Sequence, residues 1–225
     1  MEPALIVGAS IFGGIALVGG ILFAAYKFEQ ARTEKLKAIA DELGLEFFPK
    51  GDDSVKNSLG HLQLFNRGHG RRMQNMLSGQ SDEIEMAIFG YRYTTGGGKN
   101  QQTHQQTVIS FQTPALSLPA FELRPEHMFH KIGKVFGYQD INFNSHPVFS
   151  KRYLLRGSDE EAIRKLFTAD VLAFFESQQG ISVEADRDRL IYYRSGKRSK
   201  PELLRGFMEE GFRVYGLLQH GSSGA

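Results

Sequence analysis

The chain has no cysteine and no tryptophan. The absence of cysteine excludes disulfide frameworks, zinc ribbons, iron–sulfur ligation and cysteine nucleophiles. Net charge is also small, because 27 Lys and Arg residues against 25 Asp and Glu residues leave a formal charge of +2. A charge this small favours no polyanionic partner, and no recognition motif accompanies the basic clusters, so the sequence predicts no nucleic-acid ligand.

Motifs of the common hydrolase and metalloenzyme classes are missing as well. The sequence contains no Gly-x-Ser-x-Gly and no His-Glu-x-x-His. His127 and His130 have helical spacing and follow Glu126, but no third ligand is evident. We therefore predict no catalytic residue, no metal and no cofactor.

A glycine-rich stretch, YRYTTGGGKNQQTHQQTV at 91–108, raises the question of a phosphate-binding loop. A P-loop needs Ser or Thr after its lysine and a glycine five positions before its last glycine. Here Asn100 follows Lys99, and Tyr93 occupies the earlier glycine position. A strand pattern, and no helix, comes next, so we interpret 94–102 as a hairpin tip whose glycines supply positive φ angles.

Residues 3–26 contain no charged side chain. A helix of this length reaches roughly 36 Å, enough to cross a bilayer core of about 30 Å, and Glu2 stands where a cleaved signal peptide would be basic. Basic residues follow the segment and none precedes it: Lys27, Arg32, Lys35 and Lys37. The sequence therefore predicts a single-pass anchor at 1–26 with the C-terminal domain in the cytoplasm.

Small residues recur at a spacing of four within this segment, at Ala9, Gly13, Ala16, Gly20 and Ala24. Such spacing lets two membrane helices approach closely and predicts a homo-oligomer or a partner helix, which loss of self-association in Gly20→Leu would test. No glycine or proline interrupts 21–43, so we expect the helix to continue as a juxtamembrane rod through 27–44.

The remaining chain predicts an α+β fold, with antiparallel sheet and interleaved helices. We expect an α+β unit with a meander at 45–146, its strands at 45–49, 73–77, 84–93, 107–113 and 120–123, and a helix from Pro125. A strand–helix–hairpin–helix unit is expected at 147–220, with a strand at 148–155, a Ser158–Glu161 capping box and a frayed tail at 221–225.

Two basic clusters and the hairpin supply candidate contacts for a partner protein or for the lipid bilayer. In free solution both clusters would be solvated turns, but near an anionic leaflet each basic residue adds about 1 kcal/mol of attraction. The candidate contact residues are Arg67, Arg71, Arg72, Lys99, His104, Lys197 and Arg198.

Four runs, GYRYTTGGGKNQQTHQQTV, LPAFELRPE, FGYQDINF and YLLRGSDEEAIRKLF, resemble uncharacterised bacterial proteins with one N-terminal membrane helix and a cytoplasmic α+β domain. The resemblance implies a bacterial inner membrane and no assigned activity. We therefore expect a membrane-anchored cytoplasmic interaction or scaffold protein. The alternative is a membrane-tethered enzyme, such as a hydrolase, with an unrecognised site.

Overall fold

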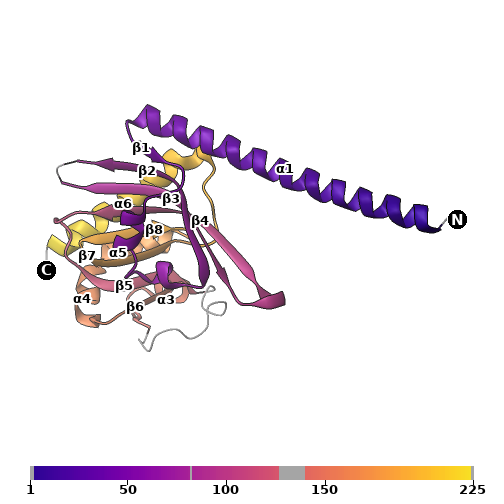
Figure 1. Cartoon of the computed structure of the whole chain (residues 1–225). Coiled ribbons are helices and arrows are strands. Elements are labelled where there is room, and N and C mark those ends of the chain that lie inside the picture. The colour runs from indigo at the N-terminus through magenta and orange to yellow at the C-terminus, as the bar shows by residue number, and fades with distance from the viewer. Residues whose placement is uncertain (1–2, 82, 127–139, 224–225) are drawn as a thin grey trace.

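The computed structural model describes residues 3–81, 83–126 and 140–223, with side chains described from Gly19 to Gly221 and the same gaps. Figure 1 shows a sheet domain from which one long helix projects. The elements, with η for short 3-10 helices, are α1 (Pro3–Leu43), β1 (Glu46–Phe48), α2 (Asp53–Ser58), η1 (Gln63–Asn66), β2 (His69–Gln80), β3 (Glu85–Thr95), η2 (Gly98–Asn100), β4 (Gln102–Gln112), β5 (Leu118–Pro125), α3 (Pro147–Arg152), β6 (Tyr153–Gly157), α4 (Glu160–Leu166), α5 (Ala169–Ser177), β7 (Ser182–Arg187), β8 (Arg189–Tyr193), η4 (Pro201–Leu203) and α6 (Leu204–Ser223).

The described strands form one antiparallel sheet in the order β1-β2-β3-β4-β8-β7-β5-β6. Helices pack on it, so the α+β prediction is confirmed. Strands from 45–146 and 147–220 share this sheet, because β4 pairs with β8 and β5 pairs with both β6 and β7. The two units expected from the sequence therefore have one continuous framework.

Each face of the sheet has its own apolar core, because successive side chains of a strand point to opposite faces. On β3, Ile88 joins the larger core, which α1, α3, α4, α5 and α6 cover. Phe89 and Tyr91 join the smaller core beneath α2 and η1, where Leu64 is fully buried.

The C-terminal part of α1, which includes the rod expected at 27–44, packs on the domain. Leu36 and Ala40, one helical turn apart, are buried in the larger core. Gly44 adopts a φ of 68°, and Leu45 N donates to the Ala40 carbonyl at 2.9 Å, which ends the helix where the sequence predicted. The apolar stripe of this rod thus contacts its own domain.

Polar contacts join α1 to the segment before α6 and to the first turn of α6. Lys35 Nζ lies 2.7 Å from Glu202 Oε1, and Arg205 Nη2 lies 2.8 Å from Glu42 Oε1. Arg32 Nη2 donates to the Ser199 carbonyl at 2.8 Å. Two segments at opposite ends of the chain therefore hold each other in place.

The N-terminal part of α1 projects away from the domain (Figure 1). Its large apolar side chains are exposed where they are described: Ile21 by 61%, Leu22 by 65%, Phe23 by 62%, Tyr26 by 58% and Phe28 by 70%. From Gly19 onward, the described part of the chain has no helix with an apolar stretch sufficient to cross a membrane.

Strands β3 and β4 form a long hairpin that projects from the domain on the same side as α1 (Figure 1). They pair from Glu85↔Gln112 to Thr95↔Gln102, so β4 begins earlier than the expected 107. Gly96 and Gly98 adopt φ angles of 75° and 56° at the tip. The hairpin interpretation of the glycine-rich stretch is confirmed.

Several local predictions for the second half were wrong. Residues 148–152 belong to helix α3, because Pro147 occupies its first turn with a φ suited to a helix start; the strand begins at Tyr153. Asp159, and not Ser158, caps α4, since its carboxylate accepts from Ala162 N at 3.0 Å. Pro125 is the last residue of strand β5, opposite Tyr153, and Glu126 begins a 3-10 turn; residues 127–137 of the expected helix lie outside the described residues.

At the C-terminus, α6 continues to Ser223, into the segment expected to fray. Gly221 lies close to the Leu166 carbonyl, where an added Cβ would be only 3.0 Å from that oxygen. This contact with α4 explains why the helix persists into the residues expected to fray.

Candidate functional site

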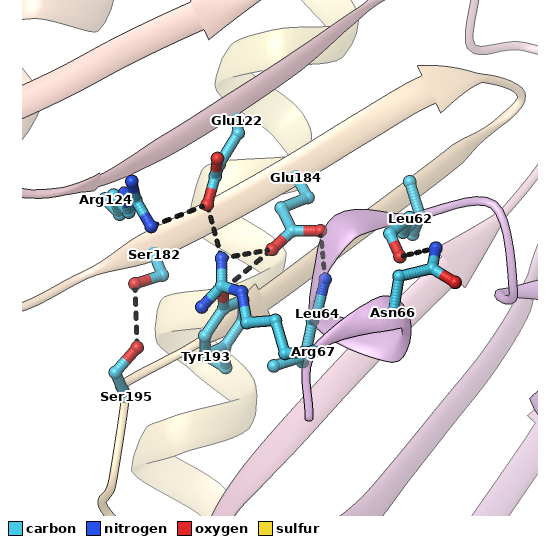
Figure 2. A network of polar contacts seen from close by, with 10 residues as sticks. All are labelled: Leu62, Leu64, Asn66, Arg67, Glu122, Arg124, Ser182, Glu184, Tyr193 and Ser195. Atoms are coloured by element: carbon cyan, nitrogen blue, oxygen red, sulfur yellow. Dashed lines mark hydrogen bonds and ion pairs between the residues drawn. The ribbon is translucent and has the colours of Figure 1, made fainter. Parts of the chain in front are cut away.

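A network of buried charges lies beneath the loop that follows η1 (Figure 2). Arg67 Nη2 donates to Glu122 Oε1 and, at 3.3 Å, to Glu184 Oε1. Glu184 Oε1 also accepts from the Tyr193 hydroxyl at 2.8 Å, and its Oε2 accepts from Leu64 N at 2.9 Å. The side chains of Arg67 and Glu184 are only 8% and 1% exposed, so both charges are removed from water.

Strand alternation brings the acidic groups to one face. Leu123 and Val183 point into the larger core, so Glu122 on β5 and Glu184 on β7 point to the opposite face, under η1. Glu122 and Glu184 are paired neighbours across these strands. Two carboxylates this close are unfavourable without a cation, and the loop supplies Arg67.

Burial sets the protonation of this cluster. It raises the pKa of Glu184, against the lowering effect of Arg67, and it raises the pKa of Tyr193 well above its ordinary value. Burial would lower the pKa of Arg67, but Tyr193, Glu184 and Glu122 outweigh it and raise that pKa. The guanidinium therefore stays charged and serves as the counter-charge for both carboxylates.

A small pocket of about 170 Å³ adjoins the network. Its lining consists of His61, Leu62, Gln63, Ala120, Phe121, Glu122, Arg156, Gly157, Ser158, Glu184, Ala185 and Asp186. Carboxylates and an imidazole in one pocket are groups that can transfer protons. Both oxygens of Glu184, however, already accept hydrogen bonds from the protein, which indicates a clamp between loop and sheet.

A larger groove of about 510 Å³ runs between α1 and the sheet. One face of α1 forms its first wall through residues spaced by three and four positions. The groove is lined by Tyr26, Glu29, Gln30, Thr33 and Glu34 of α1, and by Pro49, Gln74, Asn75, Arg92, Gln105 and Arg198 opposite. It begins at Tyr26, the last residue of the charge-free segment.

Two contacts fix the floor of the groove. Arg198 donates to both oxygens of Glu29, at 2.7 and 2.8 Å, and to Gln105 Oε1 at 3.2 Å. Asn75 has a φ of 50° within an irregular part of β2, and its Oδ1 accepts from Thr33 Oγ1 at 3.0 Å. This irregularity turns a buried polar side chain toward α1.

The Glu29–Arg198 pair gives α1 docking a pH dependence. The hydrogen bond from Arg198 and its positive charge lower the pKa of Glu29. A carboxyl whose folded pKa is depressed stabilises the fold above its unfolded pKa, near 4.5, and loses that contribution as pH falls. Because the Glu29 side chain is 43% exposed, solvent screens the pair, and we expect Glu29→Gln to cost about 1 kcal/mol or less near neutral pH.

Thermal unfolding of wild type and Glu29→Gln at about pH 7 and about pH 4 measures this effect. The difference in Tm should shrink at the lower pH. Glu34→Gln is the matched control, since Glu34 lies on the same helix and forms no ion pair with another described residue. A difference that is equal at both pH values would contradict the assignment.

Arg67 and Arg198, predicted as contacts for a partner or lipid, both pair with carboxylates of the fold, and their role in binding stays a prediction. Arg67 is buried against two carboxylates, and Arg198 is paired with Glu29. Both guanidiniums are therefore used inside the fold. Their sequence neighbours gave no sign of this, because the partner residues lie far away along the chain.

The other candidate contacts are at the surface or in the hairpin. Arg72, Lys99 and Lys197 are exposed, and exposed Arg71 donates to the carbonyls of its own loop, including that of Gly68 at 2.9 Å. His104 is half-buried; it stacks on Tyr93 with ring centroids 4.8 Å apart. Their role in binding stays a prediction.

The predicted helix-packing residues lie on the projecting part of α1. Gly20 and Ala24 are exposed there, and nothing lies within 4 Å of a Cβ added at Gly20. The side chains of Ala9, Gly13 and Ala16 are outside the described set. Their pairing with a second helix stays a prediction.

His127 and His130 also lie outside the described residues. In the described segments, no three His, Asp or Glu side chains are placed to hold a metal ion. The structure thus adds no metal ligand set to those considered from the sequence.

Comparison with known proteins finds a solved structure with a similar fold. No family model matches the chain, and no curated protein matches it. Among solved structures, the chain is similar to the mycobacterial trehalose monomycolate transport factor A, TtfA, with a TM-score of 0.60 and 12% sequence identity. The match covers 84% of this chain and 93% of that one, so it extends over nearly the whole fold.

Proposed function

We propose that the protein is a single-pass, membrane-anchored interaction protein of a bacterial inner membrane, with its α+β domain in the cytoplasm. The observation that supports this most is the continuity of α1. Residues 3–26 are free of charge, and the same helix, with no linker, carries Leu36 and Ala40 into the domain core. A domain docked in this way would be held at the membrane surface in one orientation.

The exposed apolar side chains before Glu29 support an environment other than water for that part of α1. The basic residues after the segment support a cytoplasmic domain. A protein of similar fold is named as a transport factor, which is compatible with an accessory role. An enzymatic role has less support, because the most buried carboxylate, Glu184, is fully engaged by protein groups.

A topology experiment tests the proposal. We expect a reporter fused after Ala225 to behave as cytoplasmic, and the fusion to stay in the membrane pellet after alkaline extraction. The double variant Ile15→Arg with Val18→Arg should release it, because each charge at the centre of a membrane helix costs about 3 kcal/mol.

Two results would count against the proposal. A reporter active outside the cytoplasm would reverse the orientation. Full release of the wild-type fusion by alkaline extraction, equal to that of the double variant, would contradict the proposed membrane anchor.

A further inference from the structure

Two arginines lie directly opposite each other on neighbouring strands, and one of them, Arg92, lines the groove. Arg72 on β2 is the register partner of Arg92 on β3, so both side chains point to the sheet face that α1 crosses. Like charges opposite each other in a sheet repel. Neither guanidinium has an ion-pair or hydrogen-bond partner among the described residues, although Arg198 in the same groove is paired.

The groove offers the opposite charge on its other wall. Glu34 of α1 lines it and forms no ion pair with another described residue. Glu29, the other carboxylate of the lining, is already neutralised by Arg198. The unpaired guanidinium of Arg92 and the unpaired carboxylate of Glu34 therefore face the same groove. Its volume of about 510 Å³ is within the usual size range of small-ligand sites.

The position of the groove restricts the ligand. Tyr26 lines it and is also the last residue of the charge-free segment, and tyrosine is typical of the membrane–water boundary. Gln30 Nε2 donates to the Tyr26 hydroxyl at 2.7 Å, which directs that ring along α1. If residues 3–26 span the bilayer, the groove opens at the depth of the lipid headgroups.

We infer that this groove binds the headgroup of a phospholipid that has both a phosphate and a primary ammonium. Arg92, with Arg72 beside it, contacts the phosphate, since a planar guanidinium suits phosphate oxygens. Glu34 accepts from the ammonium. This inference rests on the proposed membrane anchor and adds a lipid specificity to it.

The test uses the full chain in detergent with added phosphatidylethanolamine, phosphatidylglycerol or phosphatidylcholine, and native mass spectrometry measures the retained lipid. Phosphatidylethanolamine should be retained most. Arg92→Gln should reduce its retention about tenfold, the equivalent of one lost charge-assisted hydrogen bond. Glu34→Gln should remove the preference over phosphatidylglycerol.

Arg213→Gln is the matched control, since Arg213 is exposed on α6 and does not line the groove, so retention should not change. Equal retention by Arg92→Gln and wild type, both with unchanged Tm, would overturn the inference. Glycerophosphoethanolamine, titrated by calorimetry, distinguishes the source of the headgroup. Binding of this soluble compound as tight as that of the lipid would assign the groove to a soluble ligand and overturn the lipid assignment.

These measurements do not depend on the anchor, because lipid retention in detergent needs no insertion into a bilayer. A cytoplasmic, membrane-bound reporter together with no Arg92-dependent retention contradicts only the lipid site. Release of the reporter by alkaline extraction contradicts the proposed function itself.

Discussion

Replacing Arg67 with methionine should lower the free energy of unfolding by about 3–5 kcal/mol. Methionine keeps much of the apolar stem but removes the charge. Glu184 then loses its only ion-pair partner among the described residues, and Glu122 keeps only Arg124, whose Nη1 lies 3.5 Å from Glu122 Oε1. Loss of one partner of a buried ion pair leaves an uncompensated charge, and this dominates the cost. Chemical denaturation of the full chain in mild detergent measures the change.

Arg71→Met is the control, because Arg71 belongs to the same loop but is exposed; it should change stability by no more than about 0.5 kcal/mol. Adding Glu184→Gln to Arg67→Met should restore part of the loss, since a neutral amide is less costly to bury than a carboxylate. If Arg67→Met is no more destabilising than Arg71→Met, the buried network does not stabilise the fold.

Replacing Gly68 with alanine should destabilise the protein by about 3 kcal/mol or more, through two additive causes. Gly68 has a φ of 57°, in the left-handed region where a side chain is strained. A Cβ at this position would also overlap the carbonyl oxygen of Thr94, in the hairpin strand β3. Either β3 or the loop bearing Arg67 would have to move.

Gly70→Ala isolates the first cause, the strain of the left-handed backbone. Gly70 has nearly the same φ, 62°, but the nearest atom to its added Cβ is Thr94 Oγ1 at 4.0 Å. It should therefore cost only about 1–2 kcal/mol, the strain of the left-handed conformation. Thermal unfolding of both variants gives the comparison. An equal loss of stability in the two variants would show that the backbone relieves the overlap with the Thr94 carbonyl without cost.

Periodic segments of this fold could be predicted from the sequence. The uninterrupted residues 21–43 predicted a continuous rod, and the spacing of Leu36 and Ala40 is that of a docked helix. The hairpin expected within 147–220 is the β7–β8 pair, where Arg187 adopts a φ of 55°. Local patterns sufficed because local geometry determines these elements.

The charged network could not be predicted in this way. Glu122 and Glu184 alternate with apolar residues along their strands, which is the pattern of a solvated sheet face. They are buried because a loop 55 to 120 positions earlier in the chain covers them, as the Arg67 and Leu64 contacts show. The stretch RGHGRR, residues 67–72, likewise has the pattern of a solvated basic turn, although the side chain of Arg67 is buried against Glu122 and Glu184.

The pairing of α1 with the segment before α6 determines when the fold can be completed. Glu29 and Arg198 are 169 positions apart, and Arg32 and Ser199 are 167 apart. During synthesis the N-terminal helix emerges first, whereas its partners Arg198 and Ser199 are among the last residues to leave the ribosome. Contacts of such long range make folding slow, because the chain between them must be ordered before they form. Strands β1 and β2 can pack on the rod soon after it emerges, but its polar contacts with Arg198 and Ser199 form only when translation is nearly finished.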